Sequence, residues 1–89
     1  MKFEWHKDKE KLNIKKHRIS FDEAVTVFYD PLSATFHDLD HSIAEDRFIT
    51  VGYSSQGRLF VVSHTERGDA IRIINARPAT ISERKRHEN

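Results

Sequence analysis

Apolar residues follow a helical spacing in the first half of the chain and a strand-like spacing in the second half. Over residues 21–28 they recur every three or four positions, which buries one face of a helix. From residue 47 onward, three apolar runs at 47–54, 58–65 and 70–77 are separated by short turns. Runs of this kind joined by tight turns predict an antiparallel meander of three strands.

Two capping boxes mark where helices begin. In the first, we expect the Ser20 hydroxyl to accept from the Glu23 amide while the Glu23 carboxylate reaches back to the Ser20 amide. The Asp-Pro pair at 30–31 ends this helix, because the residue before proline disfavours helical backbone. A second box at 80–83 opens a short, basic C-terminal helix.

The remaining segments complete a mixed fold. Residues 8–17 are polar and compatible with an exposed helix, whereas residues 3–5 form either a short strand or a pair of anchoring aromatics. Residues 33–36 can form another short strand. This order predicts an α+β domain in which N-terminal helices pack on an antiparallel sheet that a short C-terminal helix follows.

Length and composition bound the class of protein. With 89 residues and 37% apolar side chains, the chain has room for a single domain over residues 1–89 with one modest core. It contains no cysteine, so no disulfide or thiolate metal site is expected. Neither a signal peptide nor an apolar span is recognisable, and we expect a cytoplasmic protein without a membrane partner.

Charge is strongly segregated although the net charge is only +1. Residues 1–18 carry seven Lys or Arg against three Asp or Glu, residues 19–46 carry seven acids and no Lys or Arg, and residues 47–89 carry eight bases against four acids. Either the segments form separate surfaces for nucleic acid and for a cationic partner, or the two signs neutralise each other within the fold.

The densest polar cluster lies on the last two predicted strands and the tail. It comprises His64, Thr65, Glu66, Arg67, Arg72, Arg77, Arg84, Arg86 and His87. Cleavage of an RNA phosphodiester needs a base for the 2′-hydroxyl, an acid for the leaving 5′-oxygen and cations for the growing phosphate charge. Imidazole and guanidinium groups supply all three without a metal.

The register of the last turn decides whether these groups meet. If Thr65 pairs with Ala70, His64 shares a face with Ile71 and Ile73, and Arg72 points to the other face. A slip of one residue brings His64 and Arg72 together. Spacing alone leaves both arrangements open.

A second polar cluster could hold a metal. The run at 37–41 contains His37, Asp38, Asp40 and His41, all of which are potential ligands of a divalent ion. Their spacing matches no recognised metal motif, and clustered acids in a loop are usually solvated. No phosphate-binding glycine loop, nucleophile elbow or dinucleotide fingerprint is present, and we expect no cofactor and no bound metal.

Specific runs of residues resemble a known family. In the first half these are Phe3-Glu4-Trp5, Asn13, Lys16-His17, Ile19 to Ala24, Val27-Phe28 and Asp30-Pro31. In the second half they are Asp40-His41-Ser42, Glu45, Arg47-Phe48, Val51-Gly52, Ser54-Ser55, Gly57 to Leu59, Val62, His64 to Arg67, Ile71 to Ile74 and Ala76-Arg77. Together they resemble the BrnT ribonuclease toxins of toxin–antitoxin systems over residues 3–84.

This resemblance implies a RelE-like fold and metal-independent cleavage of RNA that arrests translation, with or without the ribosome. It also implies neutralisation by a BrnA-type antitoxin, whose complex with the toxin binds operator DNA mainly through the antitoxin. The positions it implicates in catalysis are His64, Arg67, Arg72 and Arg77, with His87 near the place where the family usually has a tyrosine.

Two further positions depart from the family pattern. His6 replaces the aspartate that caps the first helix, so that helix is expected to start later or to be less well capped. Arg18 replaces a glycine, where a left-handed backbone would cost roughly 1 kcal/mol. The alternative to an enzyme is a noncatalytic nucleic-acid-binding module, or an inactive toxin that acts as a co-repressor.

Overall fold

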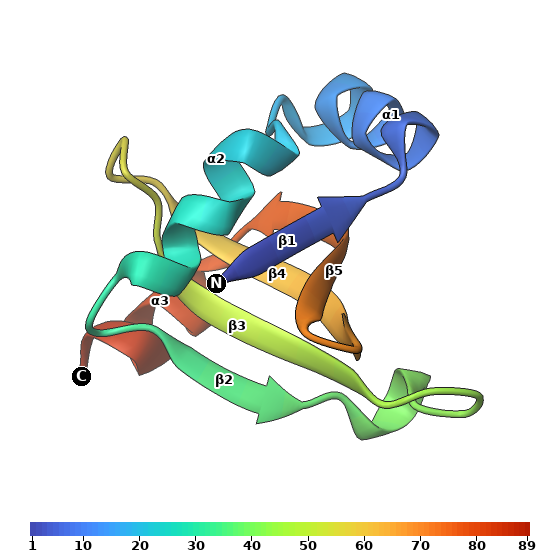
Figure 1. Cartoon of the computed structure of the whole chain (residues 1–89). Helices are drawn as coiled ribbons and strands as arrows, with labels where there is room; N and C mark the ends of the chain where they lie inside the picture. The colour runs from blue at the N-terminus through green and yellow to red at the C-terminus, as the bar shows by residue number, and fades with distance from the viewer.

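The computed structural model describes all 89 residues as one five-stranded sheet with helices around it (Figure 1). The strands lie in the order β1-β5-β4-β3-β2. Their bounds are β1 Lys2–Trp5, β2 Ala34–His37, β3 Arg47–Tyr53, β4 Leu59–Arg67 and β5 Ala70–Pro78. The helices are α1 Lys7–His17, α2 Phe21–Val25 and α3 Ile81–Glu88, with 3₁₀ turns η1 Thr26–Tyr29 and η2 Leu39–His41. The α+β class is therefore confirmed.

The sheet is mixed rather than wholly antiparallel. Strands β3, β4 and β5 form the predicted meander, but β1 pairs with β5 in parallel, Phe3 opposite Ile71 and Trp5 opposite Ile73. The prediction of an antiparallel sheet was wrong at this edge. The reason is packing, because the two aromatic side chains of β1 contact the apolar core beside the two isoleucines.

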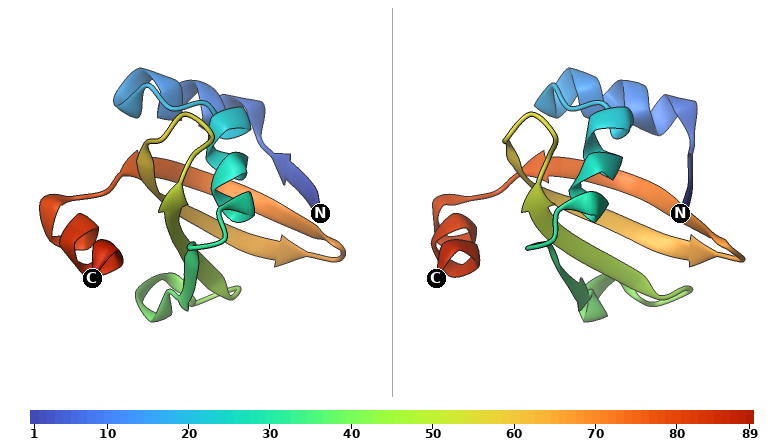
Figure 2. Two further views of the ribbon diagram at one scale, coloured as in Figure 1. Left: turned by 90° about the vertical axis from the view of Figure 1, so that its left-hand side faces the viewer. Right: turned by 60° about the vertical axis from the view of Figure 1, so that its left-hand side comes forward.

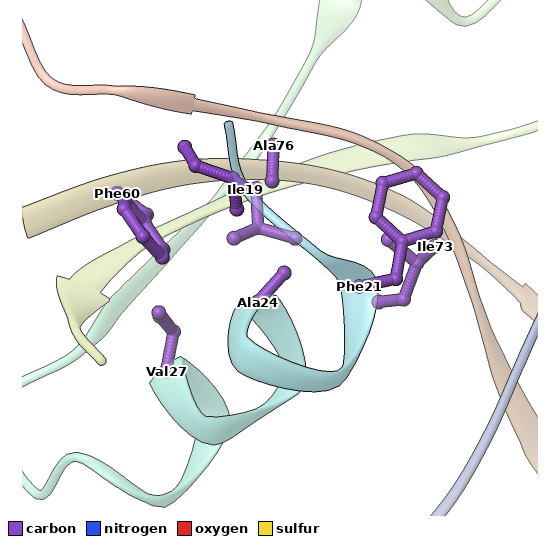
Figure 3. Close-up of a cluster of buried hydrophobic side chains, with 8 residues drawn as sticks. Ile19, Phe21, Ala24, Val27, Phe60, Ile73 and Ala76 are labelled. Atoms are coloured by element: carbon purple, nitrogen blue, oxygen red, sulfur yellow. The ribbon is translucent and has the colours of Figure 1, made fainter. Parts of the chain in front are cut away.

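One face of the sheet, here called the closed face, carries the core. Figure 3 shows Ile19, which precedes α2, and Phe21, Ala24 and Val27, from α2 and η1, packed against strand residues, of which Phe60 is one. The core also includes Val62, Ile73 and Ala76. No helix is both long and apolar enough to span a membrane.

The opposite face, here called the open face, is only partly covered. Its central positions are Ile49 on β3, Val61 and Ser63 on β4, and Asn75 and Arg77 on β5. Helix α3 lies away from α1 and α2 in both views of Figure 2. Residues of α1 border the open face at one edge of the sheet, and residues of the β2–β3 connection border it at the other.

The capping boxes fold differently from each other. At α3, Thr80 Oγ1 accepts from Glu83 N (3.1 Å) while the Glu83 carboxylate accepts from Thr80 N (2.8 Å). At α2, Ser20 Oγ accepts from Glu23 N, but the Glu23 carboxylate binds Ser54 and Arg58 instead. The predicted reciprocal bond of the first box was wrong, because the buried carboxylate pairs with a cation.

Both departures from the family pattern can be seen in the backbone. Helix α1 starts at Lys7, one residue earlier than predicted, since the His6 Nδ1 accepts from the Asp8 amide at 3.3 Å and caps it. Arg18 has φ 56° and so adopts the left-handed conformation that ends α1.

Candidate functional site

The strand register places His64 and Arg72 on opposite faces. Arg72 lies opposite Thr65, and His64 lies opposite Ile73. Neighbouring residues of a strand point to opposite sides, so His64 belongs to the closed face and Arg72 to the open face. Of the two arrangements left open by the sequence, the structure has the one that separates these residues.

His64 is buried in an aromatic and hydroxyl environment. It is 5% exposed and lies between the rings of Phe28 and Phe48, with centroids 4.9 and 6.0 Å away. Its Nε2 shares a hydrogen bond of 2.7 Å with Thr50 Oγ1, which in turn bonds Thr35 Oγ1 at 2.8 Å. Its Nδ1 has no partner.

Burial lowers the pKa of His64 to about 4. The imidazole is therefore neutral at physiological pH. A ligand on the open face cannot reach it.

The three candidate arginines all point to the open face and each faces a carboxylate. Arg72 donates to Glu4 Oε2 from Nε and Nη2 at 2.9 and 2.6 Å. Arg67 Nε lies 3.8 Å from Glu45 Oε2. Arg47, opposite Thr65 in the same cross-strand row as Arg72, has no carboxylate within 4.0 Å. Sequence reasoning had not singled out Arg47, whose position in the row depends on the pairing of three strands.

Arg77 forms a bidentate ion pair on the open face. Its two Nη atoms donate to the two Glu83 oxygens at 2.8 and 2.9 Å. This contact with Arg77, together with the capping contact to Thr80, lowers the pKa of Glu83 to about 2. The pair connects β5 to α3 and holds a guanidinium at the centre of the open face.

A groove of about 500 Å³ crosses the open face next to Arg77. Its floor is formed by Ile49, Val61, Ser63 and Asn75 from three strands. One wall is a single face of α1, where positions three or four apart contribute Lys9, Leu12, Asn13, Lys16 and His17. Two lysines and a histidine therefore face the groove from α1.

Asn13 fixes the position of α1, which forms this wall, relative to β5. Its amide donates to Ile19 O at 2.9 Å and accepts from Ala76 N at 3.0 Å. Strand β1 ends beside Ile73, so Asn13 satisfies an edge amide of β5 beyond the end of β1. Both partners of Asn13 are distant from it along the chain or on another element, so this side chain ties α1 to β5.

The opposite wall is formed by Asp38 and His41 from the β2–β3 connection. His41 Nδ1 lies 2.9 Å from Asp38 Oδ2, and the Asp38 side chain is only 13% exposed. Ser42 fixes the loop by donating to Asp38 O at 2.6 Å and accepting from Arg47 N at 3.0 Å. From the sequence, both residues were considered as metal ligands, and Asp38 also as part of an acidic surface for a cationic partner.

A second hollow of about 460 Å³ lies under α3 and shares Ile49 with the groove. Phe36 and Leu32 line it from the β2 side, whereas Arg86 and His87 line it from α3. The His87 ring lies 6.0 Å from that of Tyr53, between centroids. His87 therefore belongs to the open face, on the far side of the Arg77–Glu83 pair from the groove.

The acidic segment is largely engaged within the protein. Glu23 pairs with Arg58, Glu45 with Arg67, Asp46 with His37, and Asp38 with His41. Arginines from residues 47–89 thus neutralise Glu23 and Glu45, whereas Asp46 and Asp38 bond histidines of their own segment. Nowhere do three or more His, Asp or Glu side chains gather to hold a metal ion, so the ligand cluster considered at 37–41 does not form.

The cations that line this groove suit a polyanionic ligand. Residues 5–83 match the family model described as "Ribonuclease toxin, BrnT, of type II toxin-antitoxin system". The chain belongs to this family of ribonuclease toxins.

The fold also matches a solved structure. The crystal structure of the Brucella abortus ribonuclease toxin BrnT superposes with a TM-score of 0.71 and 24% sequence identity. The match covers 90% of this chain and 97% of the Brucella chain. Among curated proteins, none matches significantly.

Proposed function

We propose that this chain is a metal-independent endoribonuclease that cuts RNA on the open face of its sheet through attack by the ribose 2′-hydroxyl. The groove beside Arg77 carries the proposal, because it combines a fixed guanidinium with Lys9 and Lys16 in a hollow large enough for nucleotides. Guanidinium and imidazole groups supply the charge stabilisation and proton transfer that this reaction needs.

The arginines have different parts in this proposal. Arg77 stabilises the charge that grows on the scissile phosphate, since its fork can exchange the Glu83 oxygens for phosphate oxygens. Arg67 and Arg72 bind phosphates further along the RNA, and His87 contacts the RNA beside the groove. His64 takes no direct part, because it is neutral and buried on the closed face.

The cellular consequences follow from the family. Cleavage of RNA in the cytoplasm arrests translation, and a BrnA-type antitoxin neutralises the toxin and carries the complex to operator DNA. Membership of a family of type II toxin–antitoxin toxins supports an antitoxin as a partner. Suppression of cleavage by the purified product of a neighbouring antitoxin-like reading frame tests this part.

Incubation of an RNA oligonucleotide with the protein in excess chelator, with and without ribosomes, tests the proposed metal-independent ribonuclease activity. We expect products ending in a 2′,3′-cyclic phosphate, and no cleavage where the 2′-hydroxyl is replaced by hydrogen. Arg77→Gln should slow cleavage by about 10²–10³-fold, as removal of one preorganised charge-stabilising donor typically does.

Glu83→Gln is the matched control for Arg77→Gln. It removes the same ion pair but keeps the guanidinium, and glutamine still serves in a capping box. We expect this variant to lose much less activity than Arg77→Gln, because the guanidinium is still present although it is held less firmly. RNA that binds in a salt-dependent way but stays intact in every lane would favour the noncatalytic binding module instead.

A further inference from the structure

The Asp38–His41 pair is built to present one imidazole nitrogen to the groove. His41 Nδ1 is engaged by the Asp38 carboxylate at 2.9 Å, and its Nε2 has no hydrogen-bond partner in the protein. A carboxylate beside Nδ1 favours the tautomer with the proton on Nδ1 and the lone pair on Nε2. The free nitrogen is therefore a proton acceptor.

The position of Asp38 shows that the pair is held by the fold. The backbone amide of Asp38 donates to Arg47 O at 2.8 Å, and its carbonyl accepts from Ser42 Oγ. Its carboxylate is mostly buried, whereas the His41 ring is two-thirds exposed. A fixed carboxylate that orients an exposed imidazole resembles the way a catalytic histidine is oriented by an aspartate.

His17 lines the opposite wall of the same groove. It is the last residue of α1, in the same turn as Lys15 and Lys16. Its side chain forms no hydrogen bond or ion pair. The charged groups that face the two imidazoles are Asp38 from the loop, Lys9 and Lys16 from α1, and Arg77 from β5.

We propose that His41 is the general base of the cleavage reaction, that Asp38 positions it, and that His17 is the general acid across the groove. This inference rests on the proposed ribonuclease function and names the proton-transfer groups of that site. It replaces His64 in that role by a residue on the accessible face.

In the proposed reaction, the two histidines transfer one proton each while the ribose 2′-oxygen displaces the 5′-oxygen from phosphorus. His41 Nε2 takes the proton of the 2′-hydroxyl, and the 2′-oxygen forms a bond to phosphorus. The bond from phosphorus to the 5′-oxygen breaks, and that oxygen takes a proton from the His17 imidazolium. Exchange with water returns His41 to its neutral form and His17 to its protonated form.

Two substrates distinguish the base from the acid. One is an RNA with a single cleavable linkage, and the other has sulfur in place of the bridging 5′-oxygen of that linkage, so that the leaving group needs no proton. We expect His41→Ala to slow cleavage of both substrates by about 10²–10⁴-fold. His17→Ala should slow only the oxygen-linked substrate and leave the sulfur-linked one near the wild-type rate.

Added imidazole gives an independent readout. It should restore part of the activity of His41→Ala, where it can replace the missing base, and none of the activity of Arg77→Gln. Asp38→Asn should lower kcat at least tenfold and leave KM unchanged, because it misplaces the base without removing a phosphate contact.

Asp40→Asn is the matched control from the same loop. Asp40 has no ion-pair partner. This variant should cleave like the wild type. Affinity for a 2′-deoxy analogue and the far-ultraviolet circular dichroism spectrum verify that every variant still binds and folds.

Failure of this inference differs from failure of the proposed function. If His41→Ala cleaves both substrates at the wild-type rate while Arg77→Gln is inactive, the ribonuclease function stands and the assignment of His41 is overturned. If His17→Ala slows both substrates equally, His17 is not the acid. Wild-type protein that leaves both RNAs intact overturns both proposals.

Discussion

The two faces of the sheet use histidine in opposite ways. On the closed face, His64 is 5% exposed, bonded to Thr50 and surrounded by phenylalanine rings. On the open face, His41 is bonded to an aspartate and leaves its second nitrogen exposed. Residue type and nearby charge in the sequence favoured His64, whereas the environment in the fold favours His41.

The difference shows that strand direction matters more than local composition. His64 and Thr65 are neighbours along β4 but point to opposite faces, and only Thr65 shares its face with Arg72. A candidate residue in a strand can therefore be assigned to a site only when the cross-strand register is known.

Lowering the pH should produce the largest change in the free energy of unfolding. This change tests whether His64 is buried on the closed face. The pKa of His64 is lowered from 6.5 to about 4 in the folded protein, so its contribution to stability is complete above pH 6.5 and is lost as the pH falls toward 4. The corresponding loss is about 3 kcal/mol between pH 8 and pH 4. Denaturant unfolding of wild type and His64→Leu over this range measures it.

The leucine variant isolates His64 from the other titrating groups. Its free energy of unfolding should vary less with pH than that of the wild type, by the amount given above. Equal slopes in the two proteins would show that His64 is already accessible to solvent, which would remove the contrast between the faces.

Thr50→Val should cause the next largest loss in the free energy of unfolding. The substitution keeps the shape of the side chain but removes the only partner of His64 Nε2, leaving both ring nitrogens unpaired in the core. A buried polar group left unsatisfied costs roughly 2 kcal/mol. Urea denaturation checks this value.

The matched substitution on the open face is Ser63→Ala. Ser63 is half-buried in the floor of the groove, and its hydroxyl forms no hydrogen bond in the protein. We expect its free energy of unfolding to change by less than about 0.5 kcal/mol. A loss as large as that of Thr50→Val would mean that the open face is also part of the structural core.

Arg18→Gly should have a smaller effect of opposite sign. Arg18 holds a left-handed conformation at the end of α1, which glycine adopts without strain. We expect a gain of up to about 1 kcal/mol in thermal or urea unfolding, with RNA cleavage unchanged. A loss of stability would show that the arginine side chain contributes more than its backbone costs.

Much of the fold could be predicted because its signals are local. The meander follows from three apolar runs and two glycine turns, and the boxes at Ser20 and Thr80 start helices where expected. The parallel pairing of β1 could not be predicted, because it joins residues nearly 70 positions apart.

The site was harder to predict for the same reason. The groove combines a helix face, a loop and three strands, and its walls are brought together by contacts such as Asn13 with Ala76. Arg77, which lines the groove, was a candidate because of its charge and of the family resemblance. His17 and His41 were not identified as a pair, since no spacing in the sequence relates α1 to the β2–β3 connection.

Cleavage assays on His64→Leu and Arg77→Gln in parallel test most directly the claim that the open face is the catalytic face. Both proteins are assayed with one RNA in excess chelator, after unfolding curves establish that each is folded. We predict that His64→Leu cleaves within a few-fold of the wild-type rate and that Arg77→Gln loses about 10²–10³-fold. Loss of cleavage in His64→Leu with full activity in Arg77→Gln would contradict the account.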